Sequence, residues 1–224
     1  MSLFSKRYLL LSSVLFLVLV SCRISKYKYS HCDKIVLNNS ELIPIIKDNQ
    51  PLKYKATIDV LKNHLTGILI IKQIDSMNTH FVFVTELGMK MFDFVYANHT
   101  MKAEFVFDPI NKPKLINALM QNFENIFLLN AVNRNACEFS TKKIARGYDI
   151  IDGKKRFFLI GHYDDSNDLR LITQETYFKK RRASTINYTS ELIKYGYSYR
   201  KISSVQYGFI KIYTELNEIT PTND

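Results

Sequence analysis

Between residues 54 and 107 the chain is built of short stretches in which apolar and polar side chains alternate. In the first stretch Tyr54, Ala56, Ile58 and Val60 fall on one face of an extended strand, with polar side chains on the other. Four further stretches follow at short intervals, at 65–72, 80–85, 89–96 and 101–107. Strands joined this closely must be antiparallel neighbours, because a parallel pair needs a long crossover. The segment therefore predicts about five strands of an antiparallel sheet with one apolar face.

The strongest helix signal lies at residues 113–128. Pro113 suits the first position of a helix, and Leu115, Leu119 and Phe123 begin a broad apolar stripe at helical spacing. Such a stripe needs an apolar partner, and the concave face of the preceding sheet has the right size. We therefore expect the helix to cover an apolar cavity. The predicted fold class is mainly β (α+β), an incompletely closed antiparallel β-barrel with a helical lid.

The rest of the chain gives weaker signals. Residues 130–145 look irregular, and strands are expected at 155–161 and 169–173, with a final pair near 184–200 and 203–214. The expected organisation is a signal peptide at 1–21, a lipidated tether at 22–50, the half-barrel domain at 51–216 and a C-terminal tail at 217–224.

The N-terminal segment indicates export. Lys6 and Arg7 precede an apolar run, Tyr8 to Val20, which is too short to span a bilayer as a helix of about 20 residues. The run ends in Ser21 and Cys22, an ending that resembles the bacterial lipobox. This resemblance implies cleavage before Cys22 and the attachment of diacylglycerol and an N-acyl (palmitate-type) chain to it, which together anchor a protein firmly. The alternative is an ordinary secretory signal that happens to contain a cysteine.

The net charge limits which partners the protein is expected to bind, and the cysteine content bears on whether it has a disulfide. The formal net charge is +10, and without Lys6 and Arg7 there remain 29 basic and 21 acidic side chains, an excess of +8. For an exported protein this favours anionic lipid headgroups over nucleic acid. The basic run 179–182 is either a solvated strand end or a membrane-facing patch. Cys32 and Cys137 could pair in an oxidising compartment, but we expect no disulfide because Cys32 falls in the predicted tether.

No pattern of a known catalytic site is present. The sequence contains no GxSxG, HExxH, Walker or GxGxxG motif, and its five histidines are dispersed singly. We therefore expect no enzyme activity, no catalytic residue, no metal and no cofactor other than the lipid on Cys22. A hydrolase with an unrecognised site is a distant alternative.

One stretch is specific enough to suggest a family. Residues 80–94 read as a strand, a tight Leu87-Gly88 tip and a second strand, and another strand at 67–74 precedes them. This arrangement resembles the early hairpins of the LolA/LolB family and, with the lipobox, the LolB-like outer-membrane lipoproteins of Bacteroidota. The resemblance implies an eleven-stranded open barrel whose capped cavity receives the acyl chains of lipoproteins. It also places Leu87 at a protruding tip that aids transfer into the membrane, although Glu86 stands where the family has proline.

We accordingly expect a monomer, lipid-anchored at the periplasmic face of the outer membrane, that binds acyl chains and aids lipoprotein delivery. Its expected partners are membrane lipid, acylated lipoproteins and a LolA-type carrier, and not nucleic acid. From the residues alone, two alternatives remain: a tip that folds back and buries Leu87, and an interaction or scaffold lipoprotein with a filled core. The apolar cavity candidates are Ile71, Phe81, Phe83, Phe92, Phe94, Phe105, Phe107, Leu119 and Phe123.

Overall fold

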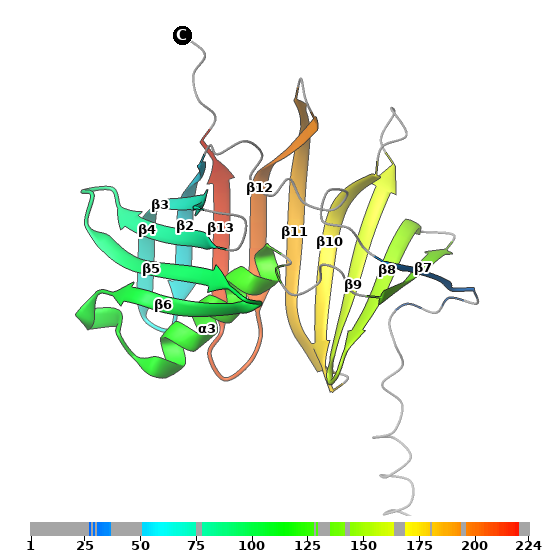
Figure 1. Ribbon diagram of the computed structural model, residues 1–224, viewed down its shortest axis with the longest axis horizontal. Helices are drawn as coiled ribbons and strands as arrows, with labels where there is room; N and C mark the ends of the chain where they lie inside the picture. The colour runs from blue at the N-terminus through cyan, green and yellow to red at the C-terminus, as the bar shows by residue number, and fades with distance from the viewer. Residues whose placement is uncertain are drawn as a thin grey trace, which may run out of the picture. The chain divides into compact units, whose positions relative to one another are not determined.

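Thirteen strands form one open antiparallel sheet in the computed structural model of the chain (Figure 1). Their order across the sheet is β1-β7-β8-β9-β10-β11-β12-β13-β2-β3-β4-β5-β6. The strands are β1 (Asp33–Val36), β2 (Leu52–Val60), β3 (Asn63–Gln73), β4 (Thr79–Thr85), β5 (Lys90–Ala97), β6 (Thr100–Val106), β7 (Asn135–Thr141), β8 (Ile144–Asp152), β9 (Lys155–Tyr163), β10 (Leu169–Phe178), β11 (Arg181–Ile193), β12 (Gly196–Gln206) and β13 (Ile212–Glu218).

The structure describes residues 27, 29, 31–36, 51–74, 78–127, 129, 135–141, 144–163, 169–179, 181–193 and 196–219. The chain divides into two compact units, Met1–Ser30 and His31–Asp224, and the sheet belongs to the second. The predicted signal peptide and Cys22 lie outside the described residues. Among the described helices, none has both the length and the apolar character needed to cross a bilayer.

Strands β2–β6 confirm the predicted hairpins. In β2 the side chains of Tyr54, Ala56, Ile58 and Val60 are buried, while Lys53 and the other polar side chains that alternate with them lie outward or half-buried. We call the buried side of the sheet the inner face and the opposite side the outer face. Period-two alternation determined this outcome, because a strand presents successive side chains to opposite faces.

Four predictions about the rest of the sheet are wrong. Residues 130–145 were expected to be irregular, but they contain β7 and the start of β8. The expected final pair of strands is a set of three, β11, β12 and β13. The sheet extends to Glu218, past the expected boundary at residue 216, and has thirteen strands among the described residues rather than eleven.

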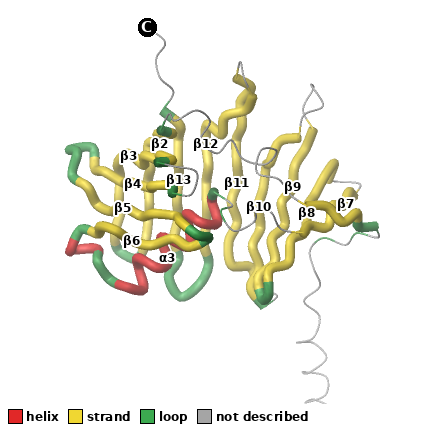
Figure 2. Tube along the Cα trace, viewed as in Figure 1, coloured by secondary structure: helices red, strands yellow, loops and turns green. Residues whose placement is uncertain are grey.

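Helix α3 (Pro113–Ile126) lies against the inner face, preceded by the short 3-10 helix η1 (Asp108–Ile110) (Figure 2). Pro113 begins the helix as predicted, at a position where its missing N–H costs nothing. The helix packs against β6, β12 and β13. Its buried side includes Leu115, Leu119 and Phe123 but also, unexpectedly, Asn122 and Asn125.

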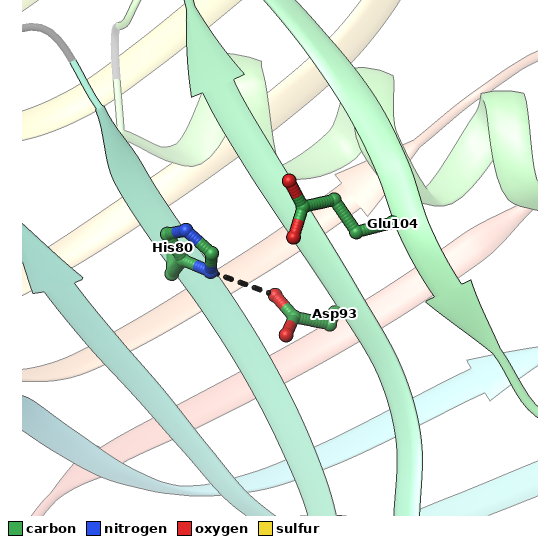
Figure 3. A group of neighbouring side chains, drawn as sticks. All are labelled: His80, Asp93 and Glu104. Carbon is green, nitrogen blue, oxygen red and sulfur yellow. Dashed lines mark hydrogen bonds and ion pairs between the residues drawn. The ribbon is translucent and has the colours of Figure 1, made fainter. Parts of the chain in front are cut away.

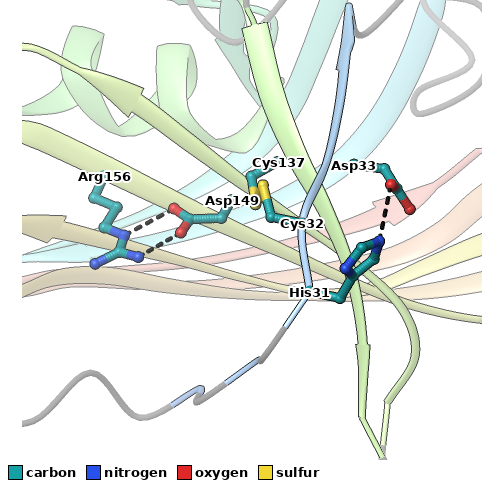
Figure 4. The surroundings of a disulfide bond; sticks show 6 residues. All are labelled: His31, Cys32, Asp33, Cys137, Asp149 and Arg156. Carbon is teal, nitrogen blue, oxygen red and sulfur yellow. Dashed lines mark hydrogen bonds and ion pairs between the residues drawn. A yellow bond between two sulfur atoms is a disulfide. The ribbon is translucent and has the colours of Figure 1, made fainter.

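A disulfide joins Cys32 to Cys137 of β7, with 5.3 Å between the Cα atoms, and corrects the expectation of unpaired cysteines (Figure 4). The expected tether at 22–50 therefore contains a strand of the sheet. Strand β1 pairs with β7 from Asp33 opposite Glu138 to Val36 opposite Asn135. This pairing brings the two cysteines together although 105 residues separate them, which no local pattern predicts. Near the disulfide, the Asp149 side chain is 1 % exposed and forms two hydrogen bonds with the guanidinium of Arg156.

Candidate functional site

The predicted cavity residues divide into three groups. Seven of them are at most 2 % exposed on the inner face or on α3, Phe107 is half-buried, and Phe105 is 40 % exposed. The placement of Phe105 in the cavity is wrong because Phe105 pairs with Asp93, whose side chain points to the outer face. The Lys90 ammonium lies 4.9 Å from the centre of the Phe105 ring. The seven buried candidates are Ile71, Phe81, Phe83, Phe92, Phe94, Leu119 and Phe123.

The buried phenylalanines form a packed cluster. The centroids of the Phe92 and Phe94 rings are 4.4 Å apart and those of Phe92 and Phe83 are 5.2 Å apart. Phe123 of α3 lies 5.8 Å from Phe92 by the same measure. Rings at these separations are in contact, as in other protein interiors. The space between these rings is therefore filled by the rings themselves, which is what a filled core predicts at this place.

A different kind of contact holds α3 to the other half of the sheet. The Asn122 amide donates to Thr214 Oγ1 at 2.7 Å and accepts from Ser204 Oγ at 2.9 Å, and all three side chains are buried. Gln174 Nε2 donates to the Asn125 carbonyl at 3.0 Å, and Tyr188 OH donates to the Ile126 carbonyl at 2.7 Å. We call these groups on α3 and β10–β13 the polar latch. Its signal in the sequence was Asn122, a polar side chain beside Phe123 in the apolar stripe, whereas positions 125 and 126 contribute only backbone carbonyls.

The polar latch and the phenylalanine cluster differ in the free energy that is lost when each is exposed to water. Neutral hydrogen bonds contribute only about 0.5–1.5 kcal/mol each, because water replaces them when they break. Exposing one buried phenylalanine costs about 1.5–3 kcal/mol. Two side-chain oxygens on this part of the inner face, Ser184 Oγ and Gln206 Oε1, are buried and find no hydrogen-bond partner among the described residues. The α3 contact with β10–β13 is therefore easier to open than the contact with the phenylalanines.

Replacing Asn122 by alanine is expected to lower the free energy of unfolding by about 1–3 kcal/mol, since Ser204 and Thr214 lose their partner while still buried. Urea unfolding followed by circular dichroism measures the change. The matched control is Gln121→Ala, an exposed neighbour on α3, which we expect to stay within about 0.5 kcal/mol of the original chain. Equal stability of the two variants would show that the latch contributes nothing.

Leu87 lies at an exposed tip between β4 and β5 and is 97 % exposed. Gly88 adopts φ +81°, and its N–H donates to the Thr85 carbonyl at 2.9 Å. Glu86, Leu87 and Gly88 thus form a three-residue hairpin turn with glycine in the left-handed position. The alternative of a tip that folds back is wrong. A hollow of about 310 Å³ beside the tip is lined partly by Phe83 and Met91.

One group on the outer face could offer three ligand atoms to a metal. His80, Asp93 and Glu104 come from β4, β5 and β6, and their ligand atoms lie within 4.8 Å of one another (Figure 3). His80 Nδ1 is 3.1 Å from Asp93 Oδ1, and the Lys90 ammonium is 3.6 Å from Asp93 Oδ2. A cation already compensates the Asp93 charge, so the group is best explained as a link between neighbouring strands.

Similarity to known proteins is found among solved structures. No family model matches the chain, and no curated protein matches it. Among solved structures it is similar to a LolA superfamily protein from Nitrosomonas europaea, with 7 % sequence identity and a TM-score of 0.45. The match covers 81 % of this chain and 88 % of that one. A likeness of this size does not assign a function.

Proposed function

We propose that this protein is a lipoprotein, anchored through Cys22 at the periplasmic face of the outer membrane, that binds acyl chains beneath α3 and aids their delivery. The observation that carries the proposal is the contrast along α3. The helix covers an apolar sheet face, yet the polar latch joins it to β10–β13. Binding is non-covalent and needs no catalytic group, metal or further cofactor.

The magnitudes favour opening of the latch by an acyl chain. Burial of a methylene group stabilises by about 0.8 kcal/mol, so a chain of about 14 methylenes gains roughly 11 kcal/mol. The four hydrogen bonds of the polar latch contribute about 0.5–1.5 kcal/mol each where water reaches the released groups, and each group that the acyl chain leaves buried without a partner costs about 1–3 kcal/mol. On the inner face beneath the latch side lie apolar side chains that such a chain would contact, namely Ile150, Leu159, Ile186 and Ile202.

The Leu87 tip supports a transfer step. A leucine exposed over 97 % of its surface at the end of a hairpin can enter the headgroup region of a bilayer. In this proposal a LolA-type carrier delivers acylated lipoproteins, the acyl chain lies beneath α3, and Leu87 contacts the receiving membrane. The protein acts as a monomer and does not bind nucleic acid.

A second function is favoured by one specific observation. The contacts among Phe81, Phe92, Phe94 and Phe123 are those of a filled core. A lipoprotein with such a core would serve as an envelope scaffold or interaction protein, with no internal ligand.

A fluorescent fatty acid distinguishes the two functions. We expect saturable binding by the purified chain, and release of the probe to phospholipid vesicles that slows in a Leu87→Ser variant while affinity stays unchanged. Glu86→Gln is the matched control, because it alters the same turn and keeps the leucine. Absence of saturable binding would favour the scaffold, and equal release rates in both variants would remove Leu87 from the transfer step.

A further inference from the structure

Four turns lie side by side where strands of the sheet end, along the lower side of the sheet in Figure 1. They join β2 to β3, β8 to β9, β10 to β11 and β12 to β13. The Lys179 N–H donates to the Lys154 carbonyl at 3.1 Å, and the Tyr207 N–H donates to the Ala183 carbonyl at 2.7 Å. Ile212 pairs with Val60, which places the β12–β13 turn next to the β2–β3 turn. Among the described residues these turns are 61–62, 153–154, 179 and 207–211. We call them, together with the strand ends beside them, the turn edge.

Large apolar side chains project from the turn edge. Phe209 is 92 % exposed and Leu61 is 62 % exposed, although both are residue types that normally lie inside a protein. Leu61 also adopts φ +56° in a two-residue turn where asparagine or glycine is favoured. A leucine that is both exposed and conformationally unfavourable serves neither folding nor solubility, which indicates a contact surface. The other exposed apolar side chains here are Ile151, Phe178, Tyr207 and Tyr213.

Cations lie among these side chains. The Lys114 ammonium of α3 is 5.5 Å from the centre of the Phe209 ring, and the Lys211 ammonium is 4.7 Å from that of Tyr213. A hydrogen bond with Tyr213 raises the pKa of Lys211. The other exposed cations of the turn edge are Lys62, Lys154, Lys179, Arg181 and Arg182.

Opposite charges at the turn edge are fewer and in part compensated. The Asp59 carboxylate is 2.5 Å from His64 Nδ1, and Asp152 is half-buried. Arg182 lies 3.5 Å from the buried Glu175 carboxylate. A hollow of about 490 Å³ lies between α3 and the β12–β13 turn, with Lys114 and Phe209 in its wall.

We propose that the turn edge docks on the surface of an anionic phospholipid bilayer, with Phe209 and Leu61 in the headgroup layer and the surrounding cations on lipid phosphates. Charge complementarity supports this occupant, and so does the alternation of aromatic and basic side chains that is typical of interfacial segments. The turns form a projecting edge, whereas single-stranded nucleic acid is held in a basic groove.

The proposed anchor at Cys22 is compatible with this docking, which rests on the proposed function for the anchor and for the choice of membrane. The disulfide holds Cys32 at β7, ten residues after Cys22. Ten extended residues reach at most about 33–36 Å. The nine-residue strand β8 spans about 30 Å, so the tether can reach the level of the turn edge. One bilayer can therefore hold the lipid anchor and contact the turn edge.

The test uses residues 22–224 with Cys22→Ser, a chain that lacks the apolar run at 8–20 and cannot be acylated, and sedimentation with vesicles. We expect binding to phosphatidylglycerol–phosphatidylethanolamine vesicles, weak binding to phosphatidylcholine vesicles, and loss of binding at high salt. Neutralising two cations, Arg181→Gln with Lys211→Gln, is expected to weaken binding about thirtyfold. Phe209→Ser is expected to weaken it about tenfold.

Matched controls keep the number and type of changes and move them off the turn edge. Lys55→Gln with Lys102→Gln alters two exposed lysines of β2 and β6, and Phe105→Ser alters an exposed phenylalanine of β6. Equal weakening by these controls, or no preference for the anionic vesicles, would overturn the proposal.

The fatty-acid titration separates the docking proposal from the proposed function, because turn-edge variants should leave the affinity for the fluorescent fatty acid unchanged. A turn edge that binds a protein instead would show no vesicle binding, and the docking proposal would fail.

Discussion

Replacing Phe123 by alanine is expected to lower the free energy of unfolding by about 3–5 kcal/mol, more than any other single truncation on α3. Phe123 is fully buried, and its ring centroid lies 5.8 Å from that of Phe92 and 6.3 Å from those of Phe81 and Phe94. Alanine removes the ring that joins the helix to β4 and β5. The loss therefore combines the transfer of the ring to water with the cavity that it leaves.

Urea unfolding measures this change, with Gln121→Ala on the exposed side of α3 as control. A loss below about 1 kcal/mol would contradict the packed cluster. The same variant also tests the interior as a ligand site. A rigid sheet leaves the cavity open, so the Phe123→Ala chain should bind the fluorescent fatty acid at least as tightly as the original chain. Weaker binding would show that the ring itself contacts the ligand.

Loss of the Cys32–Cys137 disulfide is expected to lower the free energy of unfolding by about 2–4 kcal/mol. The bond closes a long loop, because 105 residues separate the two cysteines, and it restricts the unfolded chain accordingly. Strand β1 has four residues and pairs only with β7 among the described strands. Without the bond, little holds β1 to the sheet.

The double variant Cys32→Ser, Cys137→Ser should match the original chain treated with a thiol reductant. Hydrogen exchange of the β1 and β7 amides then reports whether this edge opens while the rest of the sheet stays protected. An unchanged unfolding midpoint in the presence of reductant would contradict a stabilising role. An oxidising compartment, as the proposed export implies, would allow this bond to form and persist.

Local patterns in the sequence determined strands β2–β6 and helix α3. The alternation from Tyr54 to Val60 places one set of side chains on the buried face, independently of how the rest of the chain folds. Pro113 and the stripe that follows it likewise define a helix with one buried side. The residues around Leu87 predicted the tight turn but left open whether Leu87 folds back, and the turn that Thr85 and Gly88 close in the structure leaves it exposed.

The tertiary structure alone decided the features that depend on distant partners. Asp149 lies on the face of β8 opposite to Tyr148 and Ile150, where its buried carboxylate pairs with Arg156 of β9, a partner that the residues of β8 alone do not reveal. A register shift beside Asp93 turned Phe105 outward. The pairing of β1 with β7 joined Cys32 to Cys137, and strand order brought four separate turns to one edge. Periodicity assigns each residue to a face, but the register between strands decides which residues meet on it.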